Sequence, residues 1–363
     1  MNKSHFIYSS FLMSALLFNS CSSSFLDVEP MTSVLESNFY KTVADADMAL
    51  VGCYDGYQRT VSNGSQSFYL TAEVAADQCF GGTGTTDGRA FQAIDRFDIS
   101  ESSSDNNIFD GTWSDYYAGI FRTNTLLGKL DGTDFVNQTA ARARIEGETK
   151  FLRALMYFDL VRLFEKVPLL TSATNENIPQ ADPKDVYKLI VEDLKFAASH
   201  NPADAYPKSA AGTNDGRATP LAAKALLARV YLFYTGYYGT EDIGVTKAEA
   251  LAGLEDVISS GQFALVQNFS ALWPAASYVP NKTNNSLDIS KYIGKGNSEV
   301  VFAQKFNNTS NYNGYVDGNR WVVFLGLRGK SWSPYGQGWG ACTVSKTSLI
   351  NLVIMIRENK LLS

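Results

Sequence analysis

Apolar side chains recur every three or four residues over most of the first 261 positions of this chain, which is the spacing of one buried face of an α-helix. Two of the runs open with Asp182-Pro183 and Thr219-Pro220, in which an N-cap residue precedes a proline at the first helical position. The last run stops at Gly261, because glycine commonly ends a helix. The pattern predicts helices over about 46–57, 113–127, 141–164, 183–197, 221–238 and 247–260.

The spacing of the two start signals indicates how these helices are organised. Asp182 and Thr219 are 37 residues apart, close to the period of tetratricopeptide-like helical pairs. The chain carries no strict repeat consensus, so this prediction rests on the helical pattern alone. We expect a mainly α fold: a tetratricopeptide-like scaffold of helical hairpins with an irregular, loop-rich ligand-binding region.

Two segments break the helical pattern. Residues 62–107 are rich in glycine, serine and aspartate and are predicted to be mostly loop. From Gln262 onward, asparagine, glycine, serine and aromatic residues dominate, and four of the five tryptophans lie there. We expect loops and short strands in this part, such as Glu299-Val300-Val301-Phe302. Because binding residues usually lie on loops held by a rigid scaffold, both segments are candidate ligand regions.

The N-terminus has the features of a bacterial lipoprotein export signal. Residues 6–18 are uncharged, largely apolar and too few to span a membrane, and Cys21 follows shortly after them. We interpret 1–20 as a signal peptide and Cys21 as a lipid-bearing residue after cleavage, with Ser22-Ser23-Ser24 as a polar tether. Asn19 stands where a stricter lipobox has a small apolar residue. An ordinary signal peptide with a chance cysteine is therefore the alternative.

Composition excludes several kinds of chemistry. The 31 Lys+Arg against 37 Asp+Glu give a net charge of −6, which disfavours nucleic acid as a partner. Of the two histidines, His5 lies in the signal peptide, so any histidine-based catalysis or metal site would depend on His200 alone. The cysteines form no Cys-x-x-Cys pair, and Gly329-Lys330-Ser331 lacks the first glycine of a phosphate-binding loop. We predict no metal site, no cofactor and no catalytic residue.

A series of separate motifs follows in a fixed order along the chain: Cys21…Phe25-Leu26-Asp27…Pro30, Asn38-Phe39-Tyr40-Lys41-Thr42, Trp113…Tyr116…Arg122-Thr123-Asn124, Glu146-Gly147-Glu148…Phe151-Leu152-Arg153-Ala154, Asp185-Val186-Tyr187 and Gly216-Arg217-Ala218-Thr219-Pro220. This series resembles the SusD/RagB-type nutrient-binding lipoproteins of the Bacteroidetes. The resemblance implies an α-rich, tetratricopeptide-like scaffold on the outer-membrane surface. It also implies a TonB-dependent (SusC-like) transporter as partner and an oligosaccharide or, in some branches, a peptide as ligand.

The candidate ligand-binding residues come from both loop-rich segments. The resemblance places ligand contacts in the early region, where Asp77, Gln78 and Arg89 flank Gly81-Gly82-Thr83-Gly84. Sugar rings stack on aromatic faces, so the late aromatics are candidates for a carbohydrate platform. The alternative is structural for both groups: a solvated turn in the early loop, and packing onto the helices for the aromatics. The late candidates are Trp273, Trp321, Trp332, Tyr335 and Trp339.

Some polar and aromatic residues are expected to have structural roles only. Arg153, Arg162 and Arg229 lie in helical runs, where we expect them to pair with acids. Cys53 and Trp113 fall on apolar helical stripes and are predicted to belong to the core.

The chain departs from the family pattern in two ways. Ser22-Ser23-Ser24 replaces the acidic residues that often follow the lipid-bearing cysteine, so the face of the outer membrane that the protein reaches is left open. Family members also usually run well past this C-terminus. Here five apolar residues, 352–356, follow Leu349-Ile350-Asn351, and we interpret this end as a truncation by a shifted reading frame. A natural short member is the alternative.

These observations lead to one predicted organisation and three candidate functions. We divide the chain into a signal peptide (1–20), a helical scaffold with binding loops (21–261) and a loop-rich region (262–363). The predicted function is a non-enzymatic, lipid-anchored protein of the cell outer membrane that binds a nutrient and delivers it to a TonB-dependent transporter. The alternatives are a cell-surface glycoside hydrolase with paired carboxylates and a helical-repeat scaffold that binds only other proteins.

Overall fold

The computed structural model describes residues 39–62, 67–76, 78–82, 84, 86–101, 108–200, 216–272 and 297–306, with short pieces at 279–280, 287–288, 292–293, 328, 338–340 and 342–344. Its long helices are α2 (Val43–Ser62), α5 (Asp110–Lys129), α6 (Thr139–Phe164), α7 (Pro183–His200), α8 (Pro220–Tyr238) and α9 (Lys247–Ser259). Its shorter elements are α3 (Phe68–Ala75), α4 (Arg89–Asp95), three 3₁₀ turns (Ile99–Glu101, Leu130–Gly132 and Phe269–Leu272) and the strands β1 (Cys79–Gly81), β2 (Val279–Pro280), β3 (Leu287–Asp288) and β4 (Cys342–Val344).

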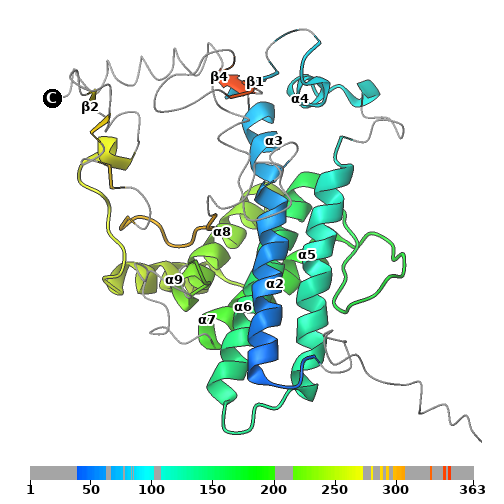
Figure 1. Ribbon diagram of the computed structural model, residues 1–363, viewed down its shortest axis with the longest axis vertical. Helices are drawn as coiled ribbons and strands as arrows, with labels where there is room; N and C mark the ends of the chain where they lie inside the picture. Colours follow the sequence, from blue (N-terminus) through cyan, green and yellow to red (C-terminus); the bar gives the residue numbers. More distant parts are fainter. Residues whose placement is uncertain are drawn as a thin grey trace, which may run out of the picture.

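The long helices pack in chain order as a series of hairpins. α2 lies against α5, both contact α6, and α6, α7 and α8 each pack on the next helix along the chain, the last of which is α9 (Figure 1). The predicted mainly α scaffold of helical hairpins is therefore confirmed. Among the described residues, no helix is both long enough and apolar enough to cross a membrane.

Helix α6 is the centre of this body. It has 26 residues, and nearly every position from Ile145 to Val161 is buried, because α2, α5 and α7 cover it from different sides. A helix buried all round carries no single apolar stripe, and α6 buries Glu148, Arg153 and Asp159 beside its apolar residues. Such charges are stable inside a protein only when they are paired, so α6 depends on partners from other helices.

The predicted helix starts are confirmed by their caps. The Thr219 hydroxyl accepts a hydrogen bond from the Ala222 backbone N–H at 3.1 Å, and Pro220 occupies the first helical position of α8. α7 begins at Pro183, directly after Asp182. These starts could be recognised in the sequence because capping is a contact between residues only two or three positions apart.

Close packing of α2 on α5 depends on glycine. A Cβ placed on Gly56 would lie 3.0 Å from the Cα of Gly119, so the two helix backbones almost touch there. Cys53 is fully buried in the main core cluster, as predicted. Trp113 is partly buried and packs at the edge of the same cluster, which supports its assignment to the core.

Two expectations from the sequence were wrong. Within residues 62–107, the part that the structure describes is not mostly loop, because it holds α3, β1 and α4. Residues 299–302 form no strand; instead the Phe302 ring packs on Phe151, with ring centroids 4.9 Å apart. A short apolar run predicts a strand and a segment packed on helices equally well, because both environments select the same side chains. The division of the chain at 261/262 stays a prediction.

Candidate ligand-binding site

A small second unit stands at one end of the helical body. It consists of α3, β1, α4 and β4, and we call it the upper module because it lies above the long helices in Figure 1. It has its own buried cluster, formed by Leu70, Val74, Cys79, Phe91 and Ile94. Ile108 and Phe109, next to the start of α5, pack against that cluster. The upper module is therefore attached to the body through the N-terminal end of α5.

The β1–β4 pairing joins the two loop-rich segments of the sequence. The strands are antiparallel, with Cys79 opposite Val344, Phe80 opposite Thr343 and Gly81 opposite Cys342. As a result, residues more than 250 positions apart share one surface. Among the described candidates, Gln78 and Arg89 of the early segment and Trp339 of the late one thus belong to the same part of the fold.

The glycine-rich turn between β1 and α4 is tightly fixed. The Gln92 side-chain amide donates hydrogen bonds to the carbonyls of Gly84 (2.5 Å) and Asp87 (2.7 Å). Gly82 has a φ of +77°, and a Cβ there would lie 2.1 Å from the Asp87 carbonyl oxygen. A side chain has no room at this position, so the sequence requires glycine there.

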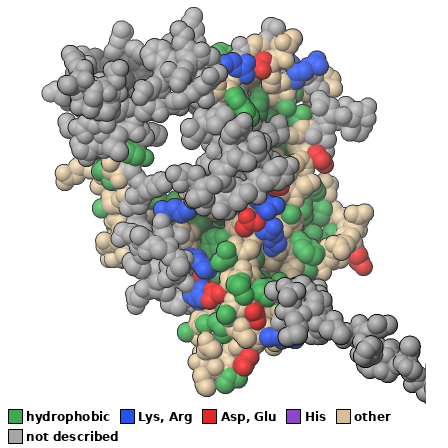
Figure 2. Space-filling model, in the orientation of Figure 1, with side chains coloured by type: hydrophobic (Ala, Val, Ile, Leu, Met, Phe, Trp, Pro, Cys, Tyr) green, Lys and Arg blue, Asp and Glu red, His purple; other side chains and the backbone are tan. Residues whose placement is uncertain are grey.

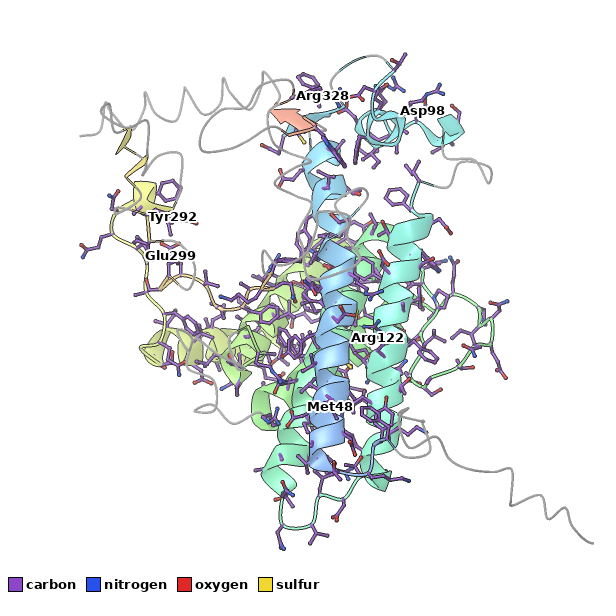
Figure 3. The ribbon with its side chains drawn as sticks, viewed as in Figure 1. Met48, Asp98, Arg122, Tyr292, Glu299 and Arg328 are labelled. Atoms are coloured by element: carbon purple, nitrogen blue, oxygen red, sulfur yellow. The ribbon has the colours of Figure 1, made fainter. Side chains whose placement is uncertain are left out.

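Arg328 joins this turn to the C-terminal segment. Its guanidinium forms an ion pair with Asp87 at 2.9 Å, and its Nε donates to the Trp339 carbonyl at 2.5 Å. Figure 3 labels Arg328 beside β4, with Asp98 nearby after α4. Because both contacts start from one planar group, the position of Trp339 is set relative to Asp87.

Large apolar side chains are exposed on the upper module. The exposed fraction is 50% for Phe80, 41% for Trp339, 73% for Phe97 and 88% for Ile99. Along β1, Cys79 is buried and Phe80 faces outward, as expected from the two-residue period of a strand. Exposed aromatic faces beside polar side chains are the usual components of a sugar-binding surface.

The structure places three of the predicted site residues on this module. Gln78 and Arg89 are exposed at the start of β1 and of α4, and Trp339 is exposed near β4. Cys21, Asp77, Trp273, Trp321, Trp332 and Tyr335 lie outside the described residues.

Sequence reasoning missed three residues of the same surface. Phe80, Asp87 and Arg328 lie in short loops and a three-residue strand, which carry almost no periodic signal. Only the buried–exposed alternation at Cys79-Phe80 could have indicated an outward-facing aromatic, and two residues are too few to establish a period.

Charges elsewhere in the described structure serve the scaffold. Arg153 pairs with Asp193 at 2.8 Å and Arg162 with Asp159 at 2.5 Å, which confirms the structural roles predicted for these arginines. Figure 2 shows basic and acidic side chains side by side over α2 and α5, where Arg59 and Arg122 both pair with Asp55. Within the described residues, no three histidine, cysteine or acidic side chains are grouped so as to hold a metal ion.

The fold and the upper module together define a scaffold-type binding protein: a rigid array of helical hairpins that presents an aromatic, polar surface at one end. A family model described as "Starch-binding associating with outer membrane" matches residues 24–232, more than half of the chain. The chain belongs to this SusD-like family.

Relatives and solved structures agree with this assignment. The chain is 24% identical to SusD-like protein P25 of Formosa agariphila over 277 residues, and 25% identical to a SusD-like protein of Bacteroides ovatus over 322 residues. These matches cover 74% and 84% of this chain but 49% and 55% of the relatives. The chain thus spans about half the length of the curated relatives it matches.

Two solved structures have the same fold. A laminarin-binding SusD-like protein is 27% identical, with a TM-score of 0.63 over 85% of this chain and 63% of that one. Surface glycan-binding protein A from Bacteroides thetaiotaomicron, solved with laminarihexaose, is 22% identical, with a TM-score of 0.65 over 86% and 61% of the two chains.

Proposed function

We propose that this chain is a non-enzymatic glycan-binding protein of the outer-membrane surface, with the upper module as its ligand site. The observation that supports the proposal is that two exposed aromatic side chains, Phe80 and Trp339, and two exposed polar ones, Gln78 and Arg89, lie in or next to the elements that the β1–β4 pairing brings together. The aromatic faces bind the C–H faces of sugar rings, while the polar groups bond the hydroxyls. Membership of a family described as starch-binding supports this ligand class.

We further propose how the protein is placed and what it does with its ligand. Cys21 carries lipid, and the residues between Cys21 and α2 tether the helical body to the membrane. The bound glycan passes to a TonB-dependent (SusC-like) transporter in the same membrane. The description of the family as associating with the outer membrane supports this location.

Removing the Trp339 side chain tests the ligand site. By analogy with base–aromatic stacking, Trp339→Ala should weaken glycan binding by about 1–3 kcal/mol, or roughly 5- to 150-fold in Kd. Laminarin is the first probe, because a 27% identical structural neighbour is a laminarin-binding protein. The measurement is affinity gel electrophoresis or calorimetry, with circular dichroism to check that the helical content is unchanged.

Tyr237→Ala is the matched control, since Tyr237 is an exposed aromatic on α8, outside the upper module. It should bind as the wild type does. If a Phe80→Ala/Trp339→Ala double variant retained wild-type affinity for a glycan that the wild type binds, the upper module would not be the ligand site. Incubating the wild type with the glycan and then measuring the length of the polymer separates a binder from a glycoside hydrolase. An enzyme shortens the polymer, whereas a binder leaves its length unchanged.

The lipid anchor has its own test. Cys21→Ala should move the protein from the membrane fraction to the soluble fraction, because no acylated residue would remain to hold it. Cell fractionation and immunoblotting of the two forms measure the change. Equal membrane partition of both forms would contradict acylation at Cys21.

A further inference from the structure

The helical body contains a surface cavity toward the opposite end of α5 from the upper module. We call it the lower groove. It has a volume of about 1080 Å³ and lies between the C-terminal turns of α5, one face of α6, the segment Phe39–Tyr40 and the loop at residues 171–173. On α5 the groove begins at Phe121, so about 17 Å of helix separates it from the start of α5 at Asp110, next to the upper module.

The charges of the lower groove are compensated within the protein. Arg142 pairs with Asp131 at 2.5 Å, and Lys150 pairs with Glu146 at 2.9 Å, one turn earlier on α6. Arg153, at the base, is paired with the buried Asp193. A fourth basic residue, in the last turn of α5, meets the carbonyl end of that helix. The groove is therefore polar without offering an uncompensated charge to an ionic ligand.

The base and rim of the groove are fixed by hydrogen bonds. The Asn124 side-chain amide donates to the carbonyls of Leu170 (2.9 Å) and Ser172 (3.3 Å). Its oxygen accepts a hydrogen bond from Arg153 at 2.8 Å. Both Asn124 and Arg153 are buried, so the loop that forms one wall is held on the helices. The groove is formed before any ligand arrives.

Aromatic side chains form the remaining wall. Phe39 and Tyr40 pack edge to face, with ring centroids 4.6 Å apart, and Phe121 is exposed on the outer side of α5. Figure 1 shows the start of α2, which follows Phe39 and Tyr40, at the same lower end as the end of α5. The groove thus combines ring faces with polar side chains that hydrogen bonds and ion pairs hold in place.

We propose that the lower groove binds a neutral oligosaccharide, as a second ligand site distinct from the upper module. A phosphate, carboxylate or metal ligand needs an uncompensated opposite charge, whereas a sugar needs oriented donors and acceptors beside an aromatic face. An extended peptide adds to a sheet edge, and the described walls here are helix sides and a loop. The volume of about 1080 Å³ slightly exceeds the ~300–1,000 Å³ typical of small-molecule sites.

A glycine in the groove wall allows a direct test. A Cβ placed on Gly128 meets nothing within 4 Å, so Gly128→Trp fills the groove without displacing its backbone. Replacing a helical glycine also removes an unfavourable residue from α5. Gly236 on α8 is equally unobstructed and lies outside the groove, so Gly236→Trp is the matched control.

The measurement is calorimetric titration with laminarihexaose and with maltohexaose. We expect at least one hexasaccharide to occupy two sites on the wild type and on Gly236→Trp. Gly128→Trp should lose one of them, with affinity there falling at least about 10-fold. Trp339→Ala should keep the site that Gly128→Trp loses, which tests the groove separately from the upper module.

Three results would overturn the proposal. The first is Gly128→Trp binding both hexasaccharides as the wild type does, which would leave the upper module as the ligand site. The second is the absence of heat from either sugar at millimolar concentration. The third is that peptides of a tryptic casein digest bind to the wild type but not to Gly128→Trp, while neither sugar gives heat of binding. That result would make the groove a peptide site.

Discussion

An Arg153→Met variant should unfold with a free energy about 3–5 kcal/mol lower than that of the wild type, because the substitution leaves the Asp193 carboxylate buried without its partner. Both side chains are buried, and Arg153 also donates to the Asn124 oxygen. The pair joins α6 to α7 through two hydrogen bonds of 2.8 Å. Urea denaturation followed by circular dichroism measures the loss.

Two further variants make this result specific. Arg142→Met is the matched control on the same helix: its partner Asp131 is 92% exposed, so the loss should stay below about 1 kcal/mol. Arg153→Met/Asp193→Leu removes both charges and should recover much of the stability. If Arg153→Met were as stable as Arg142→Met, the buried pair would not hold α6 against α7.

The stability of the wild type relative to an Asp159→Asn variant should fall as the pH rises from about 4 to about 6. Burial raises the pKa of the Asp159 carboxyl from 3.8 to about 6, against the opposing effects of Arg162, Tyr116 and Arg229. Between pH 3.8 and about pH 6 the Asp159 carboxyl binds its proton more tightly in the folded state than in the unfolded state. Stability from this group is therefore present at low pH and is lost as the carboxyl ionises.

The size of the effect follows from the two pKa values. The interval between 3.8 and about 6 corresponds to about 3 kcal/mol. Urea denaturation of both proteins at pH 4, 5, 6 and 7 measures the difference, and groups that titrate alike in both proteins cancel. If the free energy of unfolding of the wild type, relative to that of Asp159→Asn, stayed constant or rose with pH, the Asp159 carboxyl would already be well stabilised as an anion by Arg162 and Tyr116.

The same buried groups show how far the sequence could predict the scaffold. The helix over 141–164 was visible as a periodic run, and its arginines could be expected to pair with acids. The pair of Arg162 with Asp159, three residues away on the same helix, could be expected, but the pair of Arg153 with Asp193 of the next helix could not be predicted. A local pair follows from helix geometry, but a pair between helices depends on how those helices pack.

The candidate site was predictable only in its parts. The glycine-rich early loop and the late tryptophans could each be recognised as possible ligand regions by composition. That the early loop and Trp339 come together depends on three backbone pairs between β1 and β4 and on the contacts of Arg328 with Asp87 and Trp339. Phe80 and the lower groove had no sequence signal, because exposure and cavities arise where separate elements leave space between them.

The sequence by itself determined the long helices and the starts of two of them at Pro183 and Pro220, because these depend on local spacing. Only the tertiary structure decided which loop residues share a surface, which buried charges pair and where the body is hollowed. The physical reason is the range of the contacts. Helix periodicity and capping act over three or four residues, whereas Cys79 opposite Val344 and Asp87 beside Arg328 are joined only after the chain has folded.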